Sequence, residues 1–253
     1  MRPTPATAAI LVIGDEVLSG KVKDKNIGQI AEMLALIGID LVEARIVGDR
    51  EEAIIAALDA LRLAHTYVFT SGGIGPTHDD ITADAVARAF GVPIDVREDA
   101  RAILVDWYDR TGRELNEARL RMARIPQGAS LIENPVSGAP GFRIANVHVM
   151  AGVPSILRAM MENVLPTLEG GVPVHARSLP LACAEADIAA ELRALQDAHP
   201  GIAIGSYPKM VLSSKGPTRF WTEIVVRGRD ADLVEIVAAQ VESLAPAMKE
   251  IES

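Results

Sequence analysis

A glycine-rich segment with two acids, Thr70 to Thr82, has the residue types and spacing of a phosphate-binding turn. It has the sequence Thr-Ser-Gly-Gly-Ile-Gly-Pro-Thr-His-Asp-Asp-Ile-Thr and follows the apolar run Tyr67 to Phe69. Glycines let backbone N–H groups approach a ligand closely, and the first amides of a helix favour anionic groups. We therefore interpret the segment as a seat for phosphate or pyrophosphate. Its candidate ligand-binding residues are Ser71, Gly72, Gly73, Gly75, Thr77 and Asp79.

Asp79 and Asp80 stand at the mouth of the helix expected after this turn, where their charge repels a bare phosphate. A bound divalent cation resolves that conflict, and so do acids that only cap the helix. Asp80 is the better candidate for a ligand or metal contact, while Asp79 either serves instead or holds the turn. The neighbouring His78 is interpreted as an exposed bystander rather than a group that titrates in catalysis.

Asp49 is the second candidate metal ligand and catalytic acid. It has the form of a helix N-cap, worth ~1 kcal/mol, because Glu52 follows three residues later. Its loop is also expected at the same sheet edge as Asp80. Two carboxylates facing one pocket would hold Mg²⁺ or another hard cation through oxygen. The metal would then bridge phosphate oxygens and polarise phosphorus.

Two further loops contain candidates whose structural and functional interpretations both stay open. The loop that follows the apolar run 8–13 has two interpretations. It is an ordinary solvated turn, or it is a ligand site in which Glu16 is a general base or a second metal contact. A later loop, 134–141, places its amides around an anion or a planar ring, or is only rigid. The candidates are Gly14, Glu16 and Ser19 in the first loop, and Gly138, Pro140 and Gly141 in the second.

Three arginines, Arg119, Arg121 and Arg124, are close together in the chain and would neutralise ligand phosphates. The alternative is that they line a solvated helix face. The chain lacks the Lys-Ser/Thr ending of a P-loop, so that ATPase class is excluded.

The order of the elements explains why these loops should meet. Short apolar strands expected at 8–13, 39–47 and 66–70 alternate with amphipathic helices at 27–37, 54–61 and 81–90. This alternation predicts a mostly parallel α/β sheet with helices on both faces, whose ligands bind beyond the carboxyl ends of the strands. Further elements are expected as helices at 97–110, 115–124 and 154–168, a strand at 130–133 and a hairpin at 142–150.

A segment rich in glycine, 169–173, is the expected boundary between two domains, 1–170 and 171–253. Beyond it the pattern predicts a strand at 174–182, a helix at 185–198, strands at 202–207 and 220–227, and a helix at 232–244. That order is typical of a small α+β domain.

Composition limits the class of protein. Of the 253 residues, 49% are hydrophobic but only 4% aromatic, so the core must be aliphatic, as in layered α/β folds. The net charge of −9 argues against nucleic-acid binding. No apolar stretch approaches the ~20 residues of a membrane span. A single cysteine, Cys183, excludes an internal disulfide, and we expect a cytoplasmic protein.

Three motifs together resemble a known family. They are similar to the amino-terminal domain of competence/damage-inducible CinA proteins, and they lie at 14–20 with 24–26, at 70–82 and at 138–142. That domain belongs to the MoaB/Mog-like molybdopterin-binding superfamily, and the amino-terminal part of eukaryotic FAD synthases is similar too. The usual Pro-Gly-x-Pro is Ala151-Gly152-Val153-Pro154 here. Because the chain ends at Ser253, the amidase domain of full-length CinA, and its activity, are not expected.

The resemblance implies a three-layer α/β/α fold that binds molybdopterin or an adenine dinucleotide. In the CinA branch it also implies metal-dependent cleavage of a pyrophosphate, as in ADP-ribose or FAD, with Mg²⁺ or a transition metal. By motif position, Asp49 and Asp80 correspond to the acids of the Mog-type site. The resemblance implies a homo-oligomer, to which residues 171–253 would contribute by dimerisation.

The leading hypothesis is therefore a metal-dependent nucleotide pyrophosphatase. One alternative is a protein that binds molybdopterin without chemistry. Another is an adenylyltransferase that joins molybdopterin to AMP from ATP. A third is a regulator that keeps the fold with a silent site.

Overall fold

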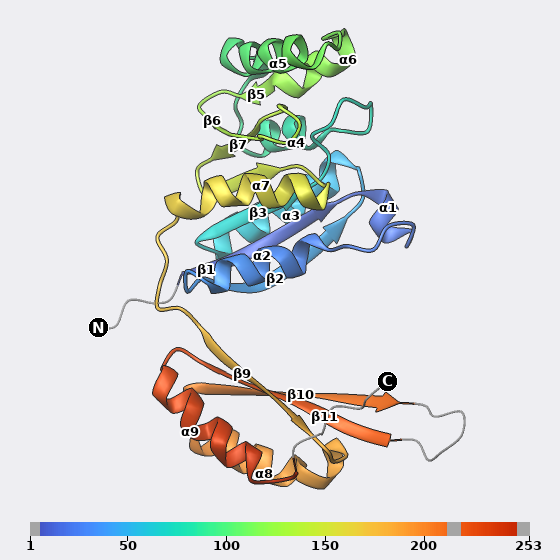
Figure 1. Cartoon of the computed structure of the whole chain (residues 1–253). Helices are drawn as coiled ribbons and strands as arrows, with labels where there is room; N and C mark the ends of the chain where they lie inside the picture. Colours follow the sequence, from blue (N-terminus) through green and yellow to red (C-terminus); the bar gives the residue numbers. More distant parts are fainter. Residues whose placement is uncertain (1–5, 212–218, 247–253) are drawn as a thin grey trace. The chain divides into compact units, whose positions relative to one another are not determined.

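The computed structural model describes residues 6–211 and 219–246 and divides the chain into two compact units, 1–171 and 172–253. Figure 1 labels the elements of both. Each unit has its own hydrophobic core. Within the described residues, no helix is long and apolar enough to cross a membrane.

A six-stranded sheet forms the centre of the first unit, in the order β2-β1-β3-β8-β7-β6. The first four strands are parallel, whereas β7 is antiparallel to both of its neighbours. This arrangement confirms the predicted, mostly parallel α/β sheet. The strands are β1 (Thr7–Ile13), β2 (Asp40–Val47), β3 (Tyr67–Ser71), β6 (Ser130–Ile132), β7 (Gly141–Ile144) and β8 (Val147–Met150).

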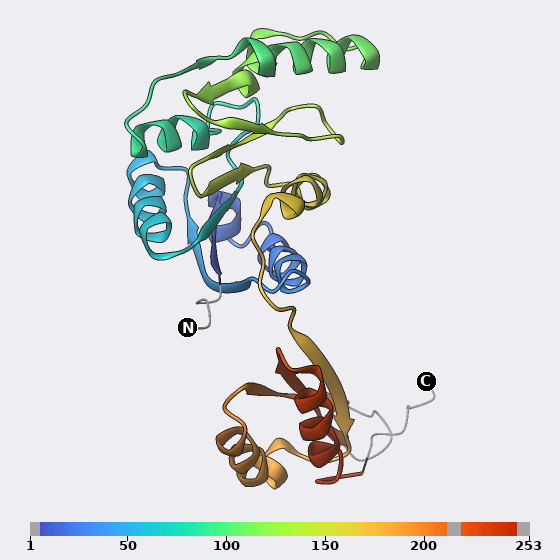
Figure 2. The same cartoon turned by 90° about the vertical axis from the view of Figure 1, so that its left-hand side faces the viewer.

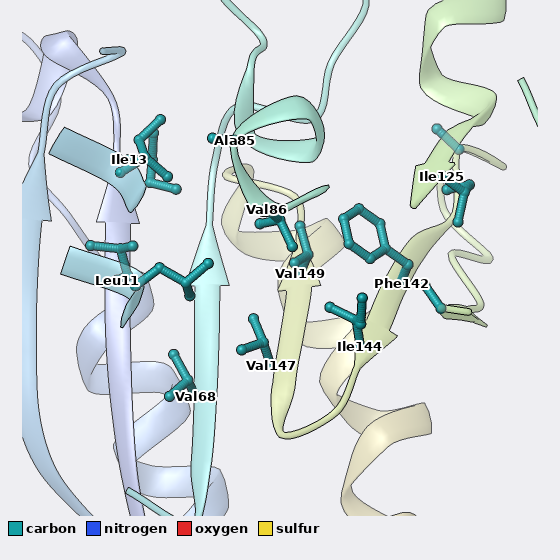
Figure 3. Packing of buried hydrophobic residues seen from close by; sticks show 14 of the residues in the cluster. Leu11, Ile13, Val68, Ala85, Val86, Ile125, Phe142, Ile144, Val147 and Val149 are labelled. Atoms are coloured by element: carbon teal, nitrogen blue, oxygen red, sulfur yellow. The ribbon is translucent and has the colours of Figure 1, made fainter. Parts of the chain in front are cut away.

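Helices cover both faces of this sheet because its strands are apolar on both sides. In β1, Ala9, Leu11 and Ile13 contribute to one core cluster, whereas Ala8, Ile10 and Val12 contribute to the other. Figure 3 shows side chains of the first cluster, among which Leu11, Val68, Val147 and Val149 come from three strands. Figure 2 shows helices on either side. They are α3 (Glu51–Ala64) and α4 (Thr82–Ala89) on the first face, and α2 (Asn26–Ala35) and α7 (Pro154–Val164) on the second.

One predicted helix is only partly correct. The segment 115–124 contains the short helix α6 (Glu117–Leu120) and a 3-10 turn (Arg121–Ala123), and its last residue opens the strand β5 (Arg124–Pro126). This strand pairs antiparallel with β4 (Ile94–Val96), which places Ile125 in the core, only 2% exposed. Burial and strand pairing outweigh the helical pattern here. Helix α5 (Glu98–Thr111) lies where a helix was predicted, and α7 ends before the predicted 168, followed by the 3-10 turn Leu165–Thr167.

The second unit is a three-stranded antiparallel sheet with two helices, as the sequence predicts. Its strand order is β10-β11-β9, and the two helices supply much of its core. The elements are β9 (His175–Leu181), α8 (Glu185–Ala198), β10 (Ile202–Val211), β11 (Arg219–Gly228) and α9 (Ala231–Glu242).

Candidate functional site

The loops after four parallel strands meet at one edge of the large sheet. The N–H of Gly14, after β1, donates to the Val47 carbonyl at the end of β2, at 3.0 Å. The N–H of Gly72, after β3, donates to the Met150 carbonyl at the end of β8, at 3.2 Å. A Cβ on Gly152 would lie 3.2 Å from the Cα of Gly72. The structure thus brings together the loops that topology alone predicted to converge.

The turn after β3 can be built only with glycine. Gly72 has φ 109°, and a Cβ there would lie 2.2 Å from the Ile13 carbonyl oxygen. Gly73 has φ 69°, and its Cβ would lie 2.1 Å from the hydroxyl oxygen of Thr82. Among the described residues, the N–H groups of Gly73, Ile74 and Gly75 have no hydrogen-bond acceptor. They are therefore available to a ligand beside the start of α4.

Asp80 closes this turn onto itself. Its Oδ2 accepts hydrogen bonds from the N–H of Thr77, at 2.8 Å, and from the Thr77 hydroxyl. A Cβ on Gly75 would lie 2.6 Å from the same oxygen. Asp80 and Thr77 therefore fix the shape of the loop.

A small pocket lies between this turn and the segment around β5. Gly73, Gly75 and Asp80 line one side of it, and Arg121 and Arg124 are also among its lining residues. Arg124 forms an ion pair with Asp84 of α4, whereas the side chain of Arg121 has no hydrogen bond or ion pair with any described residue. Arg121 is thus the free cation of this pocket.

Arg119 does not contribute to that pocket. Its guanidinium lies over the ring of Tyr108, 4.8 Å from the centroid, and donates to the Glu114 carbonyl. Of the three sequence candidates, only Arg121 combines proximity to the turn with an uncommitted charge.

Asp49 is not the N-cap that its sequence context suggested. Arg50 occupies the N-cap position of α3, with no side-chain capping bond. The Oδ2 of Asp49 instead accepts from the N–H of Asp15 at 2.9 Å, across to the loop after β1. The capping interpretation of Asp49 is therefore wrong, because its carboxylate points to the site.

Three carboxylates lie near that of Asp49 at the rim. Burial raises the pKa of Asp49, the N–H of Asp15 lowers it, and the charges of Asp15, Glu16 and Asp79 raise it further. A Cβ on Gly48 would lie only 2.2 Å from the Oδ1 of Asp15, so the Asp15 carboxylate packs directly against Gly48. Within the described part of the chain, Asp15, Glu16 and Asp49 form no ion pair. The rim therefore has unbalanced negative charge.

This charge suits a cation held jointly by protein and ligand. No group of three or more His, Cys, Asp or Glu side chains is arranged as a metal site within residues 6–211 and 219–246. Mg²⁺ is usually held by one or two carboxylates together with substrate phosphates, so the donor set fits that cation. Asp79 is the acid of the Asp79–Asp80 pair whose charge acts on Asp49. Both acids therefore remain candidate partners of Asp49, Asp80 through the pocket that it lines and Asp79 through its charge.

Asn26 is a site residue that the sequence did not reveal as one. It is 4% exposed, and its Nδ2 donates to the Ser71 hydroxyl and the Gly152 carbonyl, both at 2.7 Å. Its Oδ1 has no hydrogen-bond partner in the described structure. Asp24, not Asn26, accepts from a backbone N–H at the start of α2, that of Ile27 at 2.9 Å. Asn26 is identified as a site residue by the inward direction of its side chain, and the spacing of residues in the sequence does not show that direction.

The remaining candidates lie outside the turn. Gly138 and Gly141 are buried, and a Cβ on Gly138 would lie 2.3 Å from the Trp107 ring, so their role is in packing. Pro140 from the same loop lines the pocket beside Arg121. The Ser19 hydroxyl is exposed and donates to the Glu16 carbonyl at 3.3 Å. The side chain of His78 is 98% exposed.

Family models match both units of the chain. Residues 9–170 match the model described as "Probable molybdopterin binding domain", and residues 173–252 match "FAD synthase, middle domain".

Individual relatives agree with these matches. A CinA-like protein of Geobacter metallireducens is 38% identical over 206 residues, which cover 78% of this chain and 50% of the relative. A protein of Pyrobaculum calidifontis is 33% identical over 216 residues, which cover 80% and 81%. The crystal structure of CinA from Thermoplasma acidophilum, of unknown function, matches with a TM-score of 0.59 and 30% identity, covering 64% of this chain and 98% of that one. The chain spans about half the length of the CinA-like relative from Geobacter.

Proposed function

Because the chain belongs to the probable molybdopterin binding domain family, we propose that its first unit is a nucleotide pyrophosphatase dependent on a divalent metal. Its substrate would be a dinucleotide of the ADP-ribose or FAD type. One observation supports this most: free amides and a free arginine lie beside a rim where Asp15, Glu16 and Asp49 form no ion pair with any described residue. A diphosphate would accept hydrogen bonds from the amides and the arginine, and a cation bound to the diphosphate would neutralise the acids.

The residues of the turn would bind the phosphates. The N–H groups of Gly73, Ile74 and Gly75 would donate to phosphate oxygens, and charge that develops on these oxygens in the transition state would be stabilised by fixed dipoles. Arg121 would pair with the same or the adjacent phosphate. Such donors are already oriented before the reaction, which is the condition for electrostatic catalysis.

The acids would hold the cation and orient water. Asp49 would contact Mg²⁺ or a transition metal together with Asp80, the acid that the sequence favours, or with Asp79 as its alternative. When bound, the metal polarises phosphorus and activates water. The oxygen of water would form a bond to one phosphorus, the bridging oxygen would leave with the other phosphorus, and the proton lost by water would pass to the leaving phosphate or to solvent, so that two monophosphates are released. Asp49, whose pKa burial raises, is placed to orient that water.

Release of AMP from ADP-ribose or FAD tests the proposal. We expect purified protein with Mg²⁺ or Mn²⁺ to release AMP, and Asp49→Asn to lower the rate by roughly 100-fold or more. Asp79→Asn and Asp80→Asn show which acid shares the metal. Asp106→Asn, at an exposed i,i+4 ion pair of α5, is the matched control and should leave the rate unchanged. Wild-type protein that releases no AMP, or an Asp49→Asn variant as active as wild type, would refute the proposal.

A second function has its own supporting observation. The unpaired Oδ1 of Asn26 suits the N–H of a heterocycle such as a pterin. A protein that only binds molybdopterin predicts a raised melting temperature with the pterin, unchanged by chelation, and no turnover. An adenylyltransferase predicts pyrophosphate release only when ATP and molybdopterin are both present. A regulator with a silent site predicts neither reaction.

The assembly and location of the chain are also proposals. We infer that the protein forms a homo-oligomer in the cytoplasm, as its resemblance to the CinA group implies. Light scattering of the purified chain tests the first statement, since a mass near 26.9 kDa would show a monomer instead. Cell fractionation tests the second.

A further inference from the structure

A groove of about 370 Å³ lies between α7 and the strands β6, β7 and β8. Its lining includes Ser130, Glu133, Arg143, His148 and Asn163, none of which belongs to the glycine turn or its acids. The volume is that of a pocket for a small molecule. The groove is therefore a second candidate site on the first unit.

Strand register places the polar side chains of this groove in one row. Ser130 of β6 pairs with Arg143 of β7, and Arg143 pairs with His148 of β8. Directly paired residues project from the same face of a sheet, so the hydroxyl, the guanidinium and the imidazole are neighbours. Arg143 is exposed, and its Nε donates to the Ala145 carbonyl at 3.0 Å. Its two Nη groups have no acceptor among the described residues.

His148 is the unusual member of the row. It is 1% exposed, and neither ring nitrogen makes a hydrogen bond of good geometry in the described structure, although the backbone of Val68 and Asn146 lies close enough to act on its pKa. Its ring stacks on Phe69 with the centroids 5.1 Å apart. Buried polar groups nearly always have partners, so an unpaired imidazole in the wall of a groove indicates a place where a ligand completes the bonding.

We propose that this groove binds a small monocarboxylate. The carboxylate accepts from the Arg143 guanidinium and the Ser130 hydroxyl and lies beside His148. The apolar part of the molecule contacts Ile132 and Val164, which also line the groove. Planar guanidinium and carboxylate groups form paired, charge-assisted hydrogen bonds.

Glu133 determines which anions fit. It lines the same groove as Arg143, so a negative charge already lies near the cation before a ligand binds. A monoanion is tolerated there, whereas the second charge of a phosphate dianion is repelled. The groove therefore selects a different ligand class from the phosphate-binding turn, and its test does not depend on the pyrophosphatase proposal.

NMR of the histidine rings tests the proposal with propionate as the probe and inorganic phosphate as the comparison. The His148 resonance is assigned by its loss in His148→Phe. We expect propionate to shift it saturably, and more strongly than phosphate at equal concentration. Arg143→Gln should weaken propionate binding by roughly tenfold to a hundredfold, and Ser130→Ala by several-fold, because charge-assisted hydrogen bonds are worth about 1.5–3 kcal/mol.

The control is Arg101→Gln, which removes the same charge from an exposed ion pair with Glu98 on α5. It should bind propionate as wild type does. A His148 resonance that does not respond to propionate overturns the proposal. So does Arg143→Gln binding that equals wild type, or tighter binding of phosphate than of propionate.

Discussion

Acid should destabilise the first unit through one residue, His148. Burial, and after it the charge of Arg143, lower the pKa of His148 from 6.5 to about 4. Tyr67 and Phe69 are the rings that pack on it. Because the folded pKa lies below the unfolded one, the stability contributed by the neutral ring is complete above about pH 6.5. It is lost as the pH falls towards 4.

The size of this loss follows from the same two values. A pKa lowered from 6.5 to about 4 corresponds to roughly 3 kcal/mol, since each pKa unit is worth about 1.4 kcal/mol. Typical domains are stable by about 5–15 kcal/mol, so one ring accounts for a substantial part of the acid sensitivity. His148→Phe removes the titration and keeps an aromatic ring against Phe69.

Urea unfolding at several pH values between 4 and 7 measures the effect. The chain has two tryptophans, Trp107 in the first unit and Trp221 in the second. In a Trp221→Phe background, fluorescence therefore reports on the first unit alone. His78→Phe, at an exposed side chain, is the control and should retain the wild-type pH profile.

The comparison of variants decides the result. Other groups also titrate in this range, so the relevant quantity is the stability of His148→Phe minus that of wild type. We expect this difference to grow by roughly 3 kcal/mol from pH 7 to pH 4. If the two proteins lose stability in parallel, His148 is not the buried neutral ring that the structure describes, and the reasoning is refuted.

Three other substitutions test the site. Gly72→Ala should destabilise the first unit by more than about 2 kcal/mol in urea unfolding, because its Cβ would meet the Ile13 carbonyl. The control Gly20→Ala, with φ 74° and open space around the position, should cost only ~1 kcal/mol. Equal costs for the two variants would contradict this. Asp49→Asn should raise the melting temperature at neutral pH, because the repulsion between Asp49 and three neighbouring acids is relieved, while activity falls. A lower melting temperature would show that these acids do not destabilise the site. Asn26→Ala should cost about 2 kcal/mol by the same unfolding assay, since two buried hydrogen bonds are lost, and a neutral effect would show that they contribute little.

Sequence alone predicted the layers of this protein because strands buried on both faces and amphipathic helices leave clear periodic patterns. Helix α8 begins and ends at the predicted residues, Glu185 and Ala198. The helix predicted at 115–124 is partly present, and its last residue, Arg124, is extended because it pairs with β4 about 30 residues earlier in the chain, a contact that leaves no local signal. The resemblance to CinA proteins is confirmed by the family match and by CinA-like relatives.

The candidate site was predictable where topology alone places residues. The glycine turn and the loops after β1 and β2 converge because parallel strands share a carboxyl edge. Side-chain direction was not predictable: Asp49 has the sequence of a cap and points across to Asp15, while Asn26 has the sequence of a helix start and points inward. Both depend on contacts between residues more than 30 positions apart.

The bonds from Thr77 to Asp80 have a thermodynamic consequence. They hold the glycine amides in one arrangement without any bound molecule, so little conformational entropy is lost when an anion arrives. Removing the hydroxyl bond, as in Thr77→Ala, leaves the glycine amides in place but lets the loop sample other shapes. Calorimetry of such a variant would then show weaker association through an unfavourable entropy change, with the enthalpy nearly preserved.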